Sequence, residues 1–147
     1  MWRLTFGALV TGFLLNLTGW AGNVFLLGSM WEQAVTLAPP LMHSPFTPLT
    51  HVTLQFVSDF VFAFVLCVIY LLASKGWRGS KMTLAFLCSV TVWLGGVPMC
   101  YRGMVNGGYL PAGISVATTV LALVTFLIVA PLLPWFFRDG TVDLTSR

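Results

Sequence analysis

Four long apolar runs constrain this chain more than any other feature. They cover about residues 4–28, 52–73, 82–101 and 111–137. The hydrocarbon core of a bilayer is about 30 Å thick, and about 20 apolar helical residues cross it. Each run is long enough for one crossing, and together the four use most of the 147 residues. The sequence therefore predicts an all-α, polytopic membrane protein: a single domain, residues 1–147, with four transmembrane helices.

Composition supports this class of protein. Only 7% of the residues are charged and 58% are hydrophobic, whereas a water-soluble domain carries about 25% charged residues. A transmembrane β-barrel would need segments of about ten residues that alternate between apolar and polar, and the run VFAFVLCVIYLLA has no such alternation. The first apolar run is longer than the core of a signal peptide. We expect it to be retained as a helix.

The distribution of basic residues predicts the orientation, because cytoplasmic loops of membrane proteins are enriched in lysine and arginine. If the N-terminus is cytoplasmic, only Arg102 lies on the outer side. The inner side then holds Arg3, Lys75, Arg78, Lys81, Arg138 and Arg147. This pattern predicts N-in/C-in topology, in which four successive spans form an antiparallel up-down bundle. The net charge of +3 then reflects topology and gives no indication of nucleic-acid binding.

Asp59 is an ionisable residue inside the second apolar run. The helical rise of about 1.5 Å per residue places it about 10 Å below the outer edge of the hydrocarbon core. The same calculation places Asn16 about 12 Å below that edge. Thr118 and Thr119 of the fourth run reach a similar level. We therefore expect a polar layer in the outer half of the bundle.

The second helix carries a polar stripe on one face. His51, Gln55, Ser58 and Asp59 fall within an arc of about 100° on a helical projection. Further inward the same face becomes apolar. This pattern predicts a pocket open to the outside or a sealed polar core, and it argues against a continuous aqueous pore.

Two roles for Asp59 remain open. It could carry a proton or bind a ligand from the outer side, or it could have a structural role, hydrogen-bonded to Asn16 and the threonine layer or paired with Arg102. The candidate ligand- or proton-binding residues are Asp59, Gln55, Ser58, His51, Asn16, Thr118, Thr119 and Arg102. A metal site is not expected, because the spacing from His43 to His51 matches no ligand motif and no other cluster of ligands is evident.

Small residues predict how the helices approach one another. Small or polar residues recur in steps of three or four along the first helix and form an edge of the kind that packs closely in lipid. These residues are Ala8, Gly12, Asn16, Gly19 or Trp20, and Asn23. In the third helix, Gly95, Gly96 and Pro98 are expected to interrupt the helix and free backbone carbonyls. The outer loop, residues 29–51, contains no lysine or arginine and is rich in apolar residues. We expect it to lie at the interface, to cover the polar layer as a lid or to contact another subunit.

Motifs for catalysis or cofactors are lacking in the sequence. It contains no GxSxG, HExxH or CxxC pattern and no phosphate-binding glycine loop; the three cysteines are expected to be buried and inert. We expect no cofactor and have no indication of an enzyme.

The segment GWAGNVFLLGSMW, the outer loop rich in methionine and proline, and the short basic hairpin KGWRGSK resemble, in layout only, small four-helix bacterial inner-membrane proteins. The resemblance implies a multi-pass protein of the bacterial inner (cytoplasmic) membrane, and it implies no activity. We expect an accessory subunit or interaction partner in a larger membrane assembly, with either another membrane protein or a second copy as its partner in the lipid bilayer. The alternative is a small transporter or a ligand- or proton-binding protein with an outward-facing site around Asp59.

Overall fold

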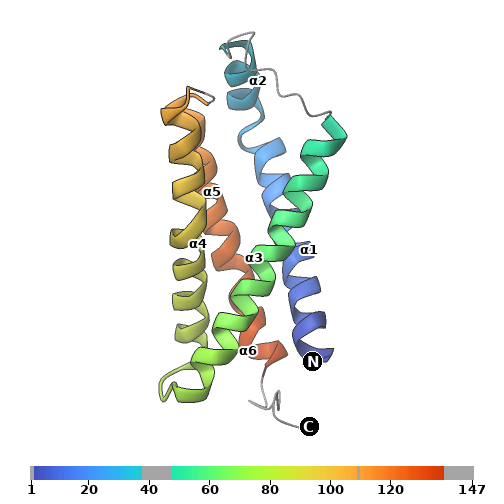
Figure 1. The fold of residues 1–147 in the computed structure, drawn as a ribbon, viewed down its shortest axis with the longest axis vertical. Coiled ribbons are helices and arrows are strands. Elements are labelled where there is room, and N and C mark those ends of the chain that lie inside the picture. The colour runs from blue at the N-terminus through green and yellow to red at the C-terminus, as the bar shows by residue number, and fades with distance from the viewer. Residues whose placement is uncertain (1, 38–47, 109, 138–147) are drawn as a thin grey trace.

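The computed structural model of the protein describes residues 2–37, 48–108 and 110–137, and within these ranges the regular structure is helical, with no strand. In chain order the helices are α1 (Trp2–Phe25), α2 (Gly28–Leu37), α3 (Pro48–Gly76), α4 (Lys81–Asn106), α5 (Ala112–Val129) and α6 (Leu132–Phe136). Figure 1 shows α1, α3, α4 and α5 as long rods that run along the length of the molecule, with α3 slanting across α1.

The prediction of four helices able to cross a membrane is confirmed. By length and hydropathy, the spans are Trp2–Phe25, Gln55–Gly76, Lys81–Asn106 and Ala112–Phe136. Several ends differ from the sequence prediction. Helix α3 extends from Pro48 to Gly76 and α4 continues to Asn106, beyond the predicted spans 52–73 and 82–101. The first helix ends at Phe25, three residues early, because the amides of Leu26 and Leu27 both bond the carbonyl of Gly22 and turn the chain into α2. The last span is divided at Ala130 and Pro131 into α5 and α6.

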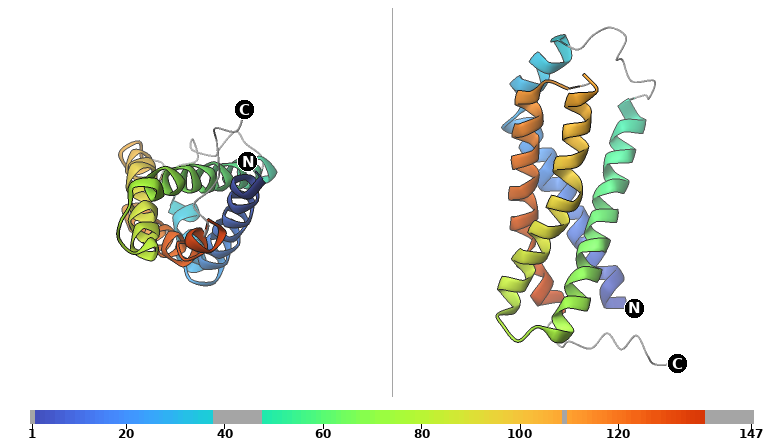
Figure 2. Two further views of the ribbon diagram at one scale, coloured as in Figure 1. Left: turned by 90° about the horizontal axis from the view of Figure 1, so that it is seen from below. Right: turned by 60° about the vertical axis from the view of Figure 1, so that its left-hand side comes forward.

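The four long helices form a ring. The neighbouring pairs are α1 with α3, α3 with α4, α4 with α5, and α5 with α1, so that α3 lies diagonally opposite α5. The end-on view in Figure 2 shows this ring directly. The start of α1 and the turn between α3 and α4 lie at one end of the bundle, while α2 and the α4–α5 connection lie at the other (Figure 1). We call these the N-terminal end and the α2 end.

Close approach between helices depends on glycine in α1. A Cβ atom added at Gly12 would lie 2.5 Å from Cδ1 of Phe60 in α3, and one added at Gly22 would lie 2.5 Å from Cδ1 of Leu121 in α5. Lipid tails provide no hydrophobic force that drives helices together, so helix pairs in a membrane depend on such close packing. The small edge predicted for α1 is therefore found at Gly12. At Gly19, by contrast, an added Cβ would meet no atom within 4 Å.

The prediction that Gly95, Gly96 and Pro98 interrupt the third helix is wrong. Helix α4 is continuous from Lys81 to Asn106 with Pro98 inside it. Proline removes the hydrogen bond to the carbonyl four residues earlier, that of Leu94, and its ring crowds the same carbonyl, yet the helix continues through it. Gly96 instead gives close contact with α3, since an added Cβ would lie 2.7 Å from the ring of Phe62. The packing of α4 therefore outweighs the local preference of these residues for a break.

The turn between α3 and α4 is fixed by polar contacts at the N-terminal end. Ser80 caps α4 and accepts a hydrogen bond from the amide of Thr83. The indole nitrogen of Trp77 donates to the carbonyl of Ser80 over 3.0 Å, and Nζ of Lys81 donates to the carbonyl of Ser74 over 2.7 Å. The basic hairpin thus uses its own side chains to satisfy backbone groups at the end of a span.

Helix α2 was not anticipated in the sequence, which predicted an outer loop from residue 29 to residue 51. Its position is fixed by Trp31, whose indole nitrogen donates to Oδ1 of Asn23 in α1 over 2.8 Å. Ala34 of α2 is buried, and the helix contacts α5 as well as α1. In the end-on view, α2 projects inside the ring of long helices (Figure 2). Residues 38–47 of the expected loop lie outside the described residues.

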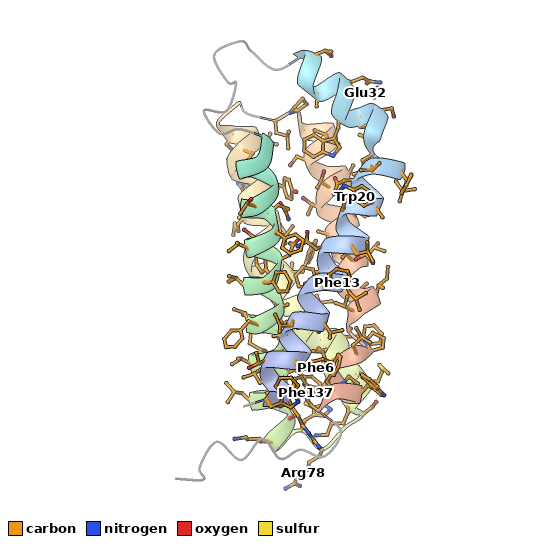
Figure 3. The ribbon with its side chains drawn as sticks, turned by 90° about the vertical axis from the view of Figure 1, so that its right-hand side faces the viewer. Phe6, Phe13, Trp20, Glu32, Arg78 and Phe137 are labelled. Carbon is orange, nitrogen blue, oxygen red and sulfur yellow. The ribbon has the colours of Figure 1, made fainter. Side chains whose placement is uncertain are left out.

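The outward faces of the long helices are covered by large apolar side chains. On α1 these side chains recur every three or four residues, and Figure 3 shows three of them, Phe6, Phe13 and Trp20, along one side of the helix. The charged residues Glu32 and Arg78 lie at opposite ends of the molecule in the same view. An apolar band between charged ends is the surface expected of a protein that crosses a bilayer.

Replacing Gly12 by alanine tests the close contact of α1 with α3. We expect Gly12→Ala to lower the free energy of unfolding by about 1–3 kcal/mol, because the added methyl group forces the ring of Phe60 to move. Gly19→Ala is the matched control in the same helix and should raise stability by about 0.5–1 kcal/mol, the difference in helix propensity. Equal effects of the two substitutions on unfolding in mixed micelles would contradict the packing described here.

Candidate functional site

Asp59 and Gln55 form a hydrogen-bonded pair on α3. They are four residues apart, so their side chains lie on the same face one helical turn from each other. Nε2 of Gln55 donates to Oδ1 of Asp59 over 3.1 Å. From Gly76, where α3 ends, the helical rise puts Asp59 about 26 Å along the axis, near the α2 end. The stripe proposed from sequence therefore contains a direct contact between two of its members.

Neighbouring helices bring two further polar groups towards this pair. Tyr101 of α4 is partly buried and interacts electrostatically with Asp59. From α1, Nδ2 of Asn16 donates to the backbone carbonyl of Phe56 in a long hydrogen bond of 3.4 Å. The side chain of Asn16 therefore contacts the backbone of α3 one turn from Asp59. We call Gln55, Asp59 and Tyr101 the α3–α4 polar cluster.

The exposure of these side chains differs along the stripe. Gln55 and Ser58 are exposed, whereas Asp59 is partly buried. The span of α3 begins at Gln55, so Gln55 lies at the end of the apolar length and Ser58 lies about one turn inside it, both on the surface of the helix. Polar groups at such positions in membrane proteins face the bundle interior, a water-filled cavity or another protein. The location of Gln55 and Ser58 on the surface of the bundle is the main constraint on any function.

Thr118 and Thr119 do not join the cluster. They belong to α5, which lies diagonally across the ring from α3. Their hydroxyl groups donate within their own helix, from Thr118 to the carbonyl of Ile114 and from Thr119 to that of Ser115. The carbonyl of Thr119 also accepts a hydrogen bond from the indole nitrogen of Trp93 in α4 over 3.0 Å. The threonines thus contribute to the α4–α5 contact.

The remaining candidates lie apart from Asp59 or outside the described side chains. Arg102 is exposed, and in the part of the chain that the structure describes no salt bridge joins it to Asp59. The backbone of His51 is helical within α3, but its side chain is not among those described. His43 lies outside the described residues. Among the described side chains, no group of three His, Cys, Asp or Glu residues could hold a metal ion.

A second set of polar residues, not anticipated in the sequence, lies in the bundle core nearer the N-terminal end. Thr11 of α1, Cys67 of α3 and Ser89 of α4 are all fully buried. The Cys67 thiol lies beside the Thr11 hydroxyl, but Oγ1 of Thr11 and Oγ of Ser89 have no partner in hydrogen-bond geometry. An unsatisfied buried hydroxyl group costs about 1–3 kcal/mol. The burial of these hydroxyl groups depends on how the helices pack. Isolated Ser and Thr residues in apolar runs therefore do not predict it.

The cysteines differ in environment. Cys67 and Cys88 are buried and Cys100 is exposed, and all three are free thiols. The expectation of buried cysteines therefore holds for two of the three. Any thiol-labelling experiment should remove Cys100 first.

Comparisons with known proteins identify no relative. No family model matches the chain, and neither the curated proteins nor the solved structures contain a match. A function must therefore be inferred from the residues themselves.

Trp93→Phe tests the contact that links α4 to α5. Because the variant loses the indole donor to the carbonyl of Thr119, we expect unfolding to become easier by about 0.6–1.7 kcal/mol, the range for hydrogen bonds between transmembrane helices. Trp135→Phe is the matched control, since Trp135 is 64% exposed. Both variants would be unfolded in mixed micelles. A Trp93→Phe protein as stable as Trp135→Phe would show that the hydrogen bond contributes nothing.

Proposed function

We propose that the chain is an accessory subunit of a larger membrane assembly, and that a partner protein covers the polar face of α3 near the α2 end. In this proposal the four spans form an antiparallel up-down bundle with N-in/C-in orientation in a bacterial inner membrane. The α2 end then faces the outside. Four of the six inner basic residues assigned from sequence belong to the N-terminal end of the molecule: Arg3, Lys75, Arg78 and Lys81.

The exposure of Gln55 and Ser58 within an apolar span supports this proposal. Lipid tails offer no hydrogen-bonding group, so polar side chains that face them are unfavourable. A neighbouring helix that carries hydrogen-bonding groups would shield Gln55 and Ser58 from lipid and would complete the environment of Asp59. The apolar faces elsewhere need no partner because lipid covers them.

A photo-crosslinking amino acid at position 58 tests the subunit proposal. We expect irradiation of whole membranes to yield one adduct of defined mass, because the partner lies against this face of α3. The control is the same amino acid at position 128, since Ile128 is 57% exposed on the apolar face of α5 and should give no discrete adduct. The mass distinguishes a different subunit from a second copy of this chain. A lack of adduct at position 58, with a purified monomer that retains no other protein, would contradict the proposal.

A second candidate function is an outward-facing site that binds a proton or a small ligand at Asp59. The hydrogen bond from Gln55 to Asp59 and the proximity of Tyr101 favour it, because the three groups combine a carboxylate with hydrogen-bond donors on the face between α3 and α4. A carboxylate inside a span is costly, by about 2.5–3.5 kcal/mol at a helix centre. A role in binding would explain its presence.

Cysteine accessibility tests this second function. In a Cys100→Ser background, a water-filled site predicts that Ser58→Cys reacts with a membrane-impermeant thiol reagent added from outside, while Thr118→Cys, whose parent residue is buried, does not. Asp59→Asn should insert normally and lose ligand or proton binding. If Ser58→Cys stays unlabelled and Asp59→Asn assembles and functions like the parent, Asp59 does not form such a site.

A further inference from the structure

The buried polar set of Thr11, Cys67 and Ser89 occupies one level of the bundle. Thr11 is nine residues above Trp2, Cys67 nine residues from Gly76, and Ser89 eight residues above Lys81. At about 1.5 Å per residue these positions lie about 12–14 Å from the N-terminal end, where the start of α1 and the α3–α4 turn come together (Figure 1). Asp59 lies about 12 Å further along the bundle, so this level is distinct from the α3–α4 polar cluster.

The hydroxyl groups of Thr11 and Ser89 differ from other threonine hydroxyl groups in the spans in their hydrogen bonding. Elsewhere, threonine hydroxyls donate to the carbonyl one helical turn earlier, as they do at Thr18, Thr91, Thr118, Thr119 and Thr125. Oγ1 of Thr11 and Oγ of Ser89 make no such bond, and both residues have no exposed surface. Their hydrogen-bonding capacity is therefore unsatisfied within the buried core.

The arrangement of the helices places these groups around a common interior. Helix α3 is the neighbour of both α1 and α4, whereas α1 and α4 lie diagonally across the ring. Cys67 of α3 lies beside Thr11 and belongs to the same buried core as Cys88, the residue next to Ser89. Thr11 and Ser89 therefore belong to the two helices that pack against α3, the helix that carries Cys67.

We propose that Thr11, Cys67 and Ser89 bind internal water in the bundle core. Internal water in proteins usually makes about three hydrogen bonds to buried polar groups that otherwise lack partners. Two hydroxyls and a thiol can supply both donors and acceptors. The set contains no charged residue, so a neutral molecule fits it better than an ion. This binding site is independent of the proposed subunit role, because none of its three residues is exposed on the surface.

Water-edited solid-state NMR of the protein in lipid bilayers tests this site without any substitution. Magnetisation from water should reach the Cβ atoms of Thr11 and Ser89 at least twofold faster than the Cβ of Ala85. Ala85 is the internal control, because it is fully buried one turn from Ser89 on the same face of α4. Equal rates at Ser89, Thr11 and Ala85 would overturn the proposal.

Two matched variants test whether Thr11 and Ser89 share the same water. Thr11→Val removes one hydroxyl at nearly constant volume, and it should reduce the transfer from water to Ser89 at least twofold. Thr125→Val is the control, because the Thr125 hydroxyl donates to its own helix over 3.0 Å and its loss should leave Ser89 unaffected. An unchanged signal in Thr11→Val, or an equal decrease in both variants, would overturn a shared site.

Discussion

Every hydrogen-bonding group inside a bilayer needs a partner that lipid cannot supply, and this constraint governs the whole structure. The backbone meets it by forming helices along all four spans. Threonine hydroxyls meet it by donating to carbonyls of their own helix, and the indole of Trp93 by donating to a neighbouring helix. Trp31 and Asn23 satisfy each other where α1 turns into α2. The polar groups to which we assign a role are a partly exposed set on α3 and a buried set in the bundle core.

These groups form two sets at different levels of the bundle. Near the α2 end, Gln55 and Ser58 face outward and Asp59 is partly buried, which favours contact with something outside the chain. Nearer the N-terminal end, Thr11 and Ser89 face inward with no exposed surface, which favours a small molecule enclosed by the chain. The exposure of the side chains therefore separates the two proposals: the first rests on polar surface that lipid does not solvate, the second on buried hydroxyl groups without a partner.

The sequence predicted the spans well because hydropathy and length determine them almost without reference to packing. It failed at Phe25, since the segment from Gly19 to Gly28 is apolar except for Asn23 and contains no residue pattern that predicts the turn into α2. It also failed at Pro98, where contact of Gly96 with Phe62 accompanies an unbroken helix. Local preferences at these sites are small compared with the packing of a whole span.

The candidate site was predictable only in part. A separation of four residues was enough to place Gln55 and Asp59 on one face, and their hydrogen bond follows directly from helical geometry. The proximity of Tyr101, the diagonal position of α5 and the inward direction of Thr11 and Ser89 depend on which helices are neighbours in the ring. Helical depth alone could not supply that information, which is why Thr118 was grouped with Asp59 although α3 and α5 are not neighbours.

The central claim, that another protein covers the outer face of α3, is tested most directly by the collision rate of a spin label at position 58. The label would be attached to Ser58→Cys in a Cys100→Ser background, in particles extracted from the membrane with their native neighbours. We predict low collision rates with both dissolved oxygen and a water-soluble nickel complex, because protein excludes both. A high rate with oxygen would show that lipid covers the site, and a high rate with nickel would show that water does. Either result would contradict the account.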